Sequence, residues 1–263
     1  NRLSFRADCH SELTVIPNTT VIPNTTVIPS LSRNLIKSIM KLFISGYGKM
    51  GKMIEKIIMS RGLEYAGWSE AVTETDPALA KECVCIDFTT PAAFRANYKF
   101  LAENFGAVVI GTTGWADIKD EVFAYFKQCG TPMIWASNYS IGVNVFFAVT
   151  DYVSRLLGKT GGYSPYMVEM HHCHKLDAPS GTAKTLADIV DGNMGVKTDI
   201  QSVRCGEIPG IHTIGFEGLN DRITLTHEAF SRKGFAAGAV EAALRVENLT
   251  GVHEFKDLFL NEN

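Results

Sequence analysis

The stretch Lys41-Leu-Phe-Ile-Ser-Gly-Tyr-Gly-Lys-Met-Gly51 decides the fold of this chain. Residues 42–45 predict a short buried strand, and the glycines that follow have the spacing GxGxxG where a helix begins. Gly46 permits a tight turn, Gly48 lets the backbone approach a pyrophosphate, and Gly51 lets the helix pack on the strand. The helix N-terminus also attracts negative charge. The alternative is a glycine turn in an α/β domain without a ligand, but the strand-to-helix context favours dinucleotide binding.

The residues after this motif alternate between helix and strand. Apolar side chains recur at helical spacing over 50–58, and Gly62 is placed to end that helix. Further strands are predicted at 63–68, 83–88, 107–110 and 133–136, with helices at 91–104 and 117–128 between them. Thr90 is placed to cap the helix 91–104, whose first turn carries Pro91. Helices between successive strands imply right-handed crossovers and therefore a Rossmann-like, doubly wound parallel sheet.

The pattern changes beyond Asn138. It predicts a long apolar helix at 143–157, a strand at 166–170, a short helix at 182–190 and strands at 211–216 and 223–227. This order is typical of an α+β unit with a mixed or antiparallel sheet. The last helix, 236–246, is rich in Ala and Gly in its early turns, which suits close packing on another element.

Two domains follow from these patterns. We expect a dinucleotide-binding domain of residues 40–138 plus 236–263. We expect a substrate-binding and oligomerisation domain of residues 139–235. The expected fold class is α/β, with a Rossmann-like first domain and an α+β second domain.

Residues 1–39 follow neither pattern. Positions 13–32 carry no charge and repeat Thr-Val-Ile-Pro-Asn-Thr in tandem, and the recurring proline is incompatible with a helix or a central strand. No segment has the roughly 7–15 apolar residues of a signal-peptide core, and Asp8 and Glu12 are atypical of a transit peptide. We expect a leader that is non-native or disordered, with Met40 as the start of the folded chain. A functional targeting arm is the alternative.

The composition excludes several classes of protein. The 263 residues are 46% hydrophobic and 20% charged, with a formal net charge of −3. These values exclude intrinsic disorder and collagen-like repeats, and they lack the basic excess of a nucleic-acid-binding protein. No apolar run reaches the roughly 18 residues of a membrane span. The six cysteines are scattered without a CxxC pair, which favours a reduced cytoplasm over a disulfide framework.

An acidic residue about 20 positions beyond the glycine motif is expected to bind the adenosine ribose. Glu70 lies just after the strand 63–68, and no Lys or Arg follows it until Lys81. Only Lys49 and Lys52 could reach a 2′-phosphate, so NADH should serve at least as well as NADPH. Two further turns end the fourth and fifth strands, where open α/β sheets bind ligands: Gly111-Thr112-Thr113-Gly114 and Ala136-Ser137-Asn138-Tyr139.

Titratable and potential metal-binding side chains are most concentrated in one segment, Glu169-Met-His-His-Cys-His-Lys-Leu-Asp-Ala-Pro-Ser-Gly-Thr182. Imidazole and thiolate bind zinc, but adjacent histidines on an extended segment point to opposite sides and Lys175 would repel a cation, so no metal is expected. Acid–base chemistry is a second interpretation, because histidine titrates near neutrality and a desolvated lysine beside cations can lose its proton. A polar loop capped by Ser180, without a chemical role, is the third. Gly181 and Thr182 would supply N–H groups at a helix N-terminus, a seat for a carboxylate.

Together these motifs resemble the 4-hydroxy-tetrahydrodipicolinate reductase family, also called dihydrodipicolinate reductases, of lysine and diaminopimelate synthesis. The resemblance runs from Met40 to the C-terminus. It rests on Glu169-x-His-His-x-His-Lys-x-Asp-Ala-Pro-Ser-Gly-Thr182, with GxGxxG and GTTG in the same order. Two more stretches agree with it: Ser137-Asn-Tyr-Ser-x-Gly-Val-Asn144 and Thr226-His-x-Ala-x-Ser-Arg232-x-x-Phe235-Ala-x-Gly-Ala239.

The resemblance implies a cytoplasmic NADH- or NADPH-dependent oxidoreductase that reduces 4-hydroxy-tetrahydrodipicolinate, a small dicarboxylate, with loss of water. It implies that His171 is a catalytic proton donor or acceptor and Lys175 the proton donor. Substrate contacts would be His172, Gly181 and Thr182. The implied cofactor contacts are Gly46, Tyr47, Gly48, Lys49, Met50, Gly51, Glu70, Gly111, Thr112, Thr113, Ala136, Ser137, Asn138 and Tyr139. A homotetramer is implied as well, and exposed edges of antiparallel strands would suit pairing between subunits.

Two features depart from the family pattern. Ala71 stands where a basic residue often follows the ribose-binding acid, which leaves the choice between NADH and NADPH open. The chain is also short between 68 and 81. Another nicotinamide-dependent dehydrogenase, acting on an amino acid or a semialdehyde, is one alternative. A dinucleotide-sensing regulator is the other, but its basic helix-turn-helix is not found in this sequence.

Overall fold

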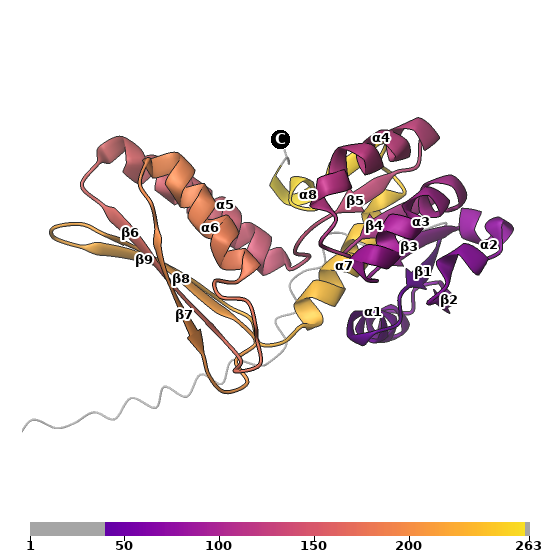
Figure 1. Cartoon of the computed structure of the whole chain (residues 1–263), viewed down its shortest axis with the longest axis horizontal. Coiled ribbons are helices and arrows are strands. Elements are labelled where there is room, and N and C mark those ends of the chain that lie inside the picture. The colour runs from indigo at the N-terminus through magenta and orange to yellow at the C-terminus, as the bar shows by residue number, and fades with distance from the viewer. Residues whose placement is uncertain (1–39, 261–263) are drawn as a thin grey trace, which may run out of the picture. The chain divides into compact units, whose positions relative to one another are not determined.

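Six parallel strands form the first sheet, in a computed structural model that describes residues 40–260. The expectations for residues 1–39 therefore lie outside the described residues. The strand order is β10–β5–β4–β3–β1–β2, and every neighbouring pair is parallel (Figure 1). The strands are β1 (Lys41–Ser45), β2 (Tyr65–Ser69), β3 (Cys83–Asp87), β4 (Ala107–Ile110), β5 (Met133–Trp135) and β10 (Val252–Glu254). The order reverses between β1 and β3, the point where sheets of this kind bind ligands.

Helices cover both faces of this sheet, as the doubly wound pattern predicts. They are α1 (Lys49–Ser60), α2 (Pro77–Lys81), α3 (Pro91–Asn104), α4 (Lys119–Cys129), α7 (Lys233–Val246) and α8 (Asp257–Leu260). The core beneath α1 and α7 includes Ile54, Ile58 and Val240, and that beneath α3 and α4 includes Phe94 and Phe126. The predicted helix 117–128 is a 3₁₀ turn at 116–118 followed by α4.

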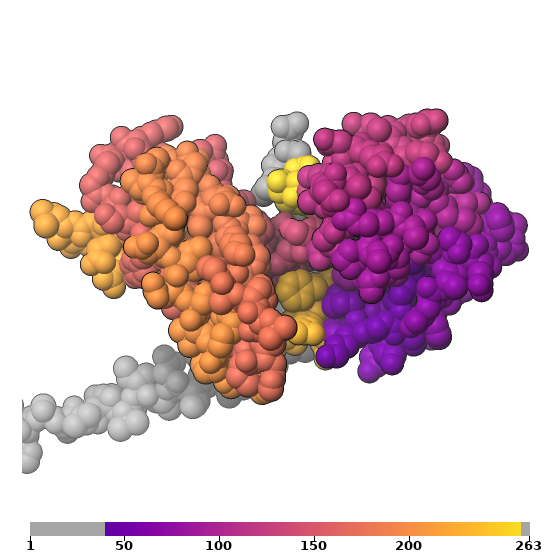
Figure 2. All heavy atoms as spheres, viewed as in Figure 1, coloured from indigo at the N-terminus to yellow at the C-terminus, as the bar shows by residue number. Residues whose placement is uncertain are grey.

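The C-terminal part of the chain returns to the first sheet. The helix α7 packs on α1, β3 and β4, and β10 pairs with β5; Figure 2 shows yellow C-terminal atoms beside the magenta atoms of the first sheet's helices. A Cβ on Gly238 would lie 1.7 Å from the Tyr139 carbonyl oxygen, so only glycine permits this approach. The predicted close packing of the Ala- and Gly-rich helix is confirmed, whereas β10 was not predicted.

The second sheet has four strands in the order β7–β6–β8–β9. They are β6 (Ser164–His171), β7 (Asp199–Arg204), β8 (Ile211–Glu217) and β9 (Arg222–Glu228). β6 is parallel to β7, while β8 is antiparallel to both β6 and β9, so the sheet is mixed. The strand β7 was not predicted, because its exposed and half-buried residues alternate without a strong apolar side.

Two helices cover one face of the second sheet, α5 (Ile141–Thr160) and α6 (Gly181–Met194) (Figure 1). The core between them and the sheet includes Phe146, Leu186 and Ile214. Ser180 caps α6 by accepting the N–H of Ala183 at 3.2 Å, and Gly195 ends the helix at a φ of 67°. The two sheets belong to one compact unit.

A helix crosses a membrane only if it is long enough and sufficiently apolar. Among residues 40–260, none of the helices combines the length and apolar character needed to cross a bilayer.

Candidate active site

The glycine turn between β1 and α1 requires glycine at two of its three positions. Gly46 has a φ of 87°, and a Cβ there would lie 2.5 Å from the Phe88 carbonyl oxygen. A Cβ on Gly51 would lie 2.3 Å from the Gly46 carbonyl oxygen. These contacts make the turn tight and bring α1 against the end of β1, as the motif predicts.

Gly48, unlike Gly46 and Gly51, has open space where a Cβ would lie. It is exposed, and a Cβ there would meet no heavy atom of the described residues within 4 Å. It is also the N-cap residue of α1, without a side-chain cap and without an acidic residue in the first turn. The first N–H groups of α1 are therefore available as donors beside open space, which is the arrangement that a pyrophosphate requires. The residues present fit a dinucleotide.

Glu70 lies beside this turn. It follows β2 directly, and the Gly46 N–H donates to the Ser69 carbonyl oxygen at 2.9 Å. Its side chain is exposed and free to reach a ribose. The rim of the turn carries an aromatic pair, Tyr47 stacked on Trp68 with ring centroids 4.0 Å apart.

A buried carboxylate connects the ends of β1 and β3 with the turn after β4. Asp87, at the end of β3, accepts hydrogen bonds from Ser45 (2.8 Å), Thr89 (3.1 Å) and Thr112 (2.6 Å). Burial raises the pKa of Asp87, and these three hydroxyl groups oppose the increase. Asp87 thereby joins β1, β3 and the turn after β4, and the sequence patterns did not single it out.

The two predicted turns after β4 and β5 meet. Thr112 and Thr113 from one, with Ala136 and Ser137 from the other, line a small cavity of about 140 Å³. Tyr139 differs from its neighbours because its side chain is buried and its hydroxyl donates to the Ile110 carbonyl oxygen at 2.8 Å. That hydroxyl supports the sheet, so only the backbone of Tyr139 could face a ligand.

A larger cavity, of about 550 Å³, is lined both by the turns after β4 and β5 and by the histidine–lysine loop. This volume suits a small-molecule site. The first group of lining residues comes from the turns: Thr113, Ser137 and Asn138. The second comes from the loop and the start of α6: His171, His172, Lys175, Ser180, Gly181, Thr182 and Thr185. The third includes Phe147, Pro209, Ser231, Arg232 and Phe235.

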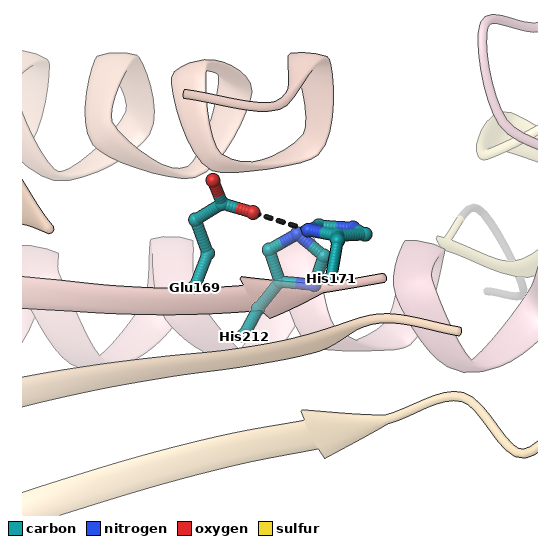
Figure 3. A group of neighbouring side chains, drawn as sticks. All are labelled: Glu169, His171 and His212. Atoms are coloured by element: carbon teal, nitrogen blue, oxygen red, sulfur yellow. Dashed lines mark ion pairs between the residues drawn. The ribbon is translucent and has the colours of Figure 1, made fainter. Parts of the chain in front are cut away.

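The strand register explains why three polar side chains meet at one end of the second sheet. Glu169 and His171 are two residues apart on β6 and share a face, and Glu169 lies directly opposite His212 on β8. Figure 3 shows all three side chains rising from adjacent strands on the side that faces a helix. The same face carries apolar core residues farther along the strands, so these polar groups are buried.

Glu169 is a fully buried carboxylate with two partners. Its Oε1 accepts a hydrogen bond from Arg204 Nη2 at 2.6 Å, and its Oε2 contacts the Nδ1 of His171 (Figure 3). Burial acts to raise the pKa of Glu169, but Arg204, Ser202 and His171 outweigh it and the pKa is lowered. Glu169 is therefore ionised at neutral pH.

The two buried histidines are held in the neutral form. Burial lowers the pKa of His171, against the opposing influence of Glu169. Burial, and then the neighbouring His171, lower the pKa of His212 to about 4. The Nδ1 of His171 is buried against Glu169, so Nε2 is the nitrogen that can serve the cavity.

Lys175 has a defined partner in the loop after β6. Its Nζ lies 2.7 Å from Asp177 Oδ1, and this ion pair lowers the pKa of Asp177. The start of α6 follows, where Ser180 occupies the N-cap and leaves the first N–H groups, those of Gly181 and Thr182, as donors. The cavity thus combines an ammonium group, a neutral imidazole and an anion seat.

Within residues 40–260, two groups of side chains have the types that bind transition metals. Glu169, His171 and His212 form the first, but both oxygens of Glu169 already have partners, one of them a guanidinium. The second group is exposed: Cys173, His174 and Glu207, with ligand atoms within 4.8 Å of one another. His174 and Glu207 form an ion pair there at 3.5 Å. Neither arrangement places a free ligand set in the cavity beside Lys175.

The sequence patterns missed several residues of this site. Arg204 and His212 lie on strands far along the chain from the histidine–lysine loop, and no local motif marked them. Arg232 lies in one of the stretches that carry the family resemblance, and it lines the cavity. The available signal was Glu169, a carboxylate placed just before three histidines and a lysine. If such a charge is buried, it requires a partner.

Comparisons with known proteins agree along nearly all of the described residues. The model of the family described as "Dihydrodipicolinate reductase, N-terminus" matches residues 40–139, and that described as "Dihydrodipicolinate reductase, C-terminus" matches residues 142–259. A 4-hydroxy-tetrahydrodipicolinate reductase of Christiangramia forsetii is 36% identical over 232 residues, covering 83% of this chain and 97% of that protein. One of Archaeoglobus fulgidus is 34% identical over 242 residues, covering 78% of this chain and 93% of that protein.

A solved structure shares the fold. It is the dipicolinate-bound dihydrodipicolinate reductase from Paenisporosarcina sp. TG-14, with a TM-score of 0.70 and 21% identity. The match covers 84% of this chain and 100% of that one. The arrangement of a six-stranded parallel sheet and a second mixed sheet is therefore common to both.

Proposed function

Because this chain belongs to the dihydrodipicolinate reductase family, we propose that the 550 Å³ cavity is its active site and that His171 and Lys175 are the catalytic groups. One observation carries the proposal. The histidine–lysine loop, the N-terminus of α6 and the turns after β4 and β5 all line this cavity. Hydride delivery, proton delivery and carboxylate binding would therefore occur in one place.

The reaction itself follows from the family. The chain is an NADH- or NADPH-dependent oxidoreductase of lysine and diaminopimelate synthesis, and it reduces 4-hydroxy-tetrahydrodipicolinate to tetrahydrodipicolinate with loss of water. Loss of the 4-hydroxyl leaves a conjugated imine. Addition of hydride at C4 gives an enamine, which must then be protonated at C3. The overall reaction consumes one hydride and one proton and releases one water.

The nucleotide would be held by residues 46–51, with Glu70 at the ribose and with Gly111, Thr112, Thr113, Ala136, Ser137, Asn138 and Tyr139 around the nicotinamide. The reduced nicotinamide supplies the hydride when bound. The exposed Gly48 and the uncapped N-terminus of α1 support this assignment at the pyrophosphate end. The cavity shared by Thr113, Ser137 and Asn138 supports it at the nicotinamide end.

The substrate dicarboxylate would lie at the start of α6. The N–H groups of Gly181 and Thr182 would bind one carboxylate, and His172 would contact the ring substituents. Arg232 adds a guanidinium to the same cavity. Cations and helix N–H groups around one space fit a doubly charged ligand, and the relative from Paenisporosarcina is described as bound to dipicolinate.

Proton transfer would be divided between two groups. Lys175 carries an ammonium group beside Asp177 and would donate the proton to C3 of the enamine. His171 is neutral because burial lowers its pKa, and its Nδ1 faces Glu169. Its Nε2 would then accept the proton from C3 and pass it to the departing 4-hydroxyl, which leaves as water, so the acid and the base are separate residues.

Replacement of the two residues tests these roles. We expect His171→Ala and Lys175→Ala each to reduce kcat by roughly 100-fold or more with folding intact. Lys184→Ala, on the exposed side of α6, and His253→Ala, on β10, are matched controls, and both should keep normal turnover. The assay follows NADH absorbance with freshly generated product of the preceding synthase. Near-normal turnover of either variant would remove that residue from the mechanism, and NADH oxidation only with aspartate semialdehyde would point to the alternative dehydrogenase.

The domain boundaries, the assembly and the compartment are further proposals. Residues 40–138 plus 236–263 would form the nucleotide domain and residues 139–235 the substrate domain, which the return of β10 to β5 supports. The second sheet carries exposed apolar side chains such as Val203 and Ile223, which support a homotetramer formed through this domain. Light scattering that showed a monomer at micromolar concentration would contradict the tetramer. A cytoplasmic location is supported by the five free cysteines of the described residues.

A further inference from the structure

Arg204 occupies a central position between the two proposed catalytic side chains. It ends β7, directly opposite His171 in the parallel register with β6. Its Nη2 donates to Glu169 Oε1 and to the Asp177 carbonyl oxygen, both at 2.6 Å. A third hydrogen bond runs from Nη1 to the Val203 carbonyl oxygen at 2.8 Å. One guanidinium group thus contacts both the strand and the loop that carry the active-site residues.

Two of these three acceptors belong to residues that touch a catalytic group. Glu169 contacts Nδ1 of His171 with its second oxygen. Asp177 binds Nζ of Lys175 with its side chain at 2.7 Å. A continuous series of contacts therefore runs from His171 through Glu169, Arg204 and Asp177 to Lys175.

We propose that Arg204 is a positioning residue that orients His171 and Lys175 together, through Glu169 on one side and Asp177 on the other. The inference rests on the catalytic roles proposed above for those two residues. Arg204 itself does not line the 550 Å³ cavity. Its effect on the reaction is therefore transmitted through its partners.

The contact with Glu169 selects one form of His171. A neutral imidazole carries its proton on only one nitrogen, and a carboxylate at Nδ1 places the proton there. Nε2 is left as an acceptor toward the cavity. Arg204 keeps Glu169 ionised and holds its carboxylate in place, because the guanidinium binds the other oxygen.

The contact with Asp177 acts on Lys175. A lysine side chain has many rotamers, and its ammonium group is a mobile point charge. Asp177 holds it, but Asp177 lies in the exposed loop between β6 and α6, with a side chain 55% exposed. The hydrogen bond from Arg204 to the backbone of Asp177 fixes that part of the loop against β7.

Arginine suits this position better than lysine. The planar guanidinium presents several N–H groups in fixed directions, so it can bind a carboxylate and two carbonyl oxygens at once. A lysine would keep the positive charge beside Glu169 but could not make all three contacts. Arg204→Lys therefore keeps the positive charge beside Glu169 and removes the fixed geometry of the three hydrogen bonds.

The test uses Arg204→Lys, Glu169→Gln and Asp177→Asn, compared with Arg222→Lys and Glu217→Gln. The control pair lies on the same second sheet, with Arg222 Nη2 at 2.9 Å from Glu217 Oε1, and is exposed. We expect each of the three test variants to lower kcat by roughly 10–100-fold while KM for both substrates stays within about threefold. The control variants should keep the wild-type kcat. A test variant with unchanged kcat, or with the loss confined to KM, would overturn the proposal.

A merely structural role is distinguished by a double-mutant cycle. In a Lys175→Ala background, Asp177→Asn should cause no further loss of kcat, because its partner is gone. Arg204→Lys should lower kcat by a smaller factor in the Lys175→Ala background than in the wild type. Equal losses in both backgrounds would show a structural effect and would overturn the proposal.

The protonation of His171 provides an independent readout. Nitrogen-15 NMR of the imidazoles should show His171 with its proton on Nδ1 in the wild type and in Asp177→Asn, and a mixture of forms in Glu169→Gln. If Glu169→Gln does not fold, Arg204→Lys and Asp177→Asn still decide the outcome through kcat. An unchanged His171 signal in a folded Glu169→Gln protein would refute the contact with Glu169 as the cause.

The same experiments separate this inference from the proposed function. If His171→Ala and Lys175→Ala retain normal turnover, the proposed function fails first. If those two variants lose turnover while Arg204→Lys and Asp177→Asn do not, only the inference about Arg204 fails.

Discussion

The hydroxyl group of Ser180 lies 3.1 Å from Nε2 of His212 while it accepts the N–H of Ala183 as the cap of α6. One side chain thus connects the helix that begins at the anion seat with the buried histidine on β8. Ser180→Ala should lower the free energy of unfolding by about 1–3 kcal/mol, because it removes a cap and leaves a buried imidazole nitrogen without its partner. Ser140→Ala is the matched control, since Ser140 caps α5 at Val143 without a histidine partner. Urea denaturation measures the free energy of unfolding of both variants. An equal loss in Ser180→Ala and Ser140→Ala would contradict the role of His212.

Stability should decrease as the pH falls through the range in which the buried histidines titrate. The pKa of His212 in the folded chain is about 4, below its ordinary value of 6.5, so the unfolded state binds more protons between these values. The contribution of His212 is complete above about pH 6.5 and decreases by about 2 kcal/mol by about pH 4.5. The lowered pKa of His171 and of His227 adds to the decrease in the same direction. Urea denaturation across this pH range measures how steeply the free energy of unfolding changes with pH.

A variant without the imidazole isolates the contribution of His212 to that slope. His212→Asn should flatten the pH dependence, whereas His174→Asn, at an exposed histidine of the loop after β6, should not. A slope that His212→Asn leaves unchanged would show that other groups cause the acid sensitivity.

The glycine turn offers a pair of variants with opposite expectations. Gly51→Ala should destabilise the fold by roughly 1–3 kcal/mol, because its Cβ would lie 2.3 Å from the backbone of Gly46. Gly48→Ala should leave the melting temperature unchanged, since its Cβ points into open space. It should nevertheless weaken NADH binding by about tenfold or more, because that space is where the pyrophosphate would lie. Thermal unfolding and NADH fluorescence titration measure the two effects, and normal NADH affinity in Gly48→Ala would place the nucleotide elsewhere.

The cofactor preference should follow from Glu70 and Ala71. Glu70 is exposed at the end of β2, where it can accept hydrogen bonds from both hydroxyls of a ribose. NADH should therefore give a kcat/KM at least equal to that of NADPH, and Ala71→Arg should shift the ratio toward NADPH. Steady-state kinetics with each cofactor checks this. A wild-type preference for NADPH of about 100-fold would contradict the assignment of Glu70.

Local sequence patterns were sufficient to predict most strands of the first sheet. The apolar runs of β1, β3 and β4 are buried on both faces, and continuous buried runs of this kind are read directly from a sequence. The short edge strand β10 has only half-buried residues, and β7 alternates between exposed and half-buried ones. Their place in the sheets is decided by pairing with β5 and β6, which are distant in sequence.

The same distinction applies to the candidate site. The sequence by itself determined the chemistry that is local: the glycine turn, the histidine–lysine loop and the helix start at Ser180, because turns, caps and motifs depend on neighbours along the chain. Only the tertiary structure decided which groups serve that chemistry from a distance. Arg204 and His212 reach Glu169 because strand pairing places β7 and β8 on either side of β6. A buried carboxylate must find its partners across the sheet, and the register of the strands, not the spacing of residues, specifies them.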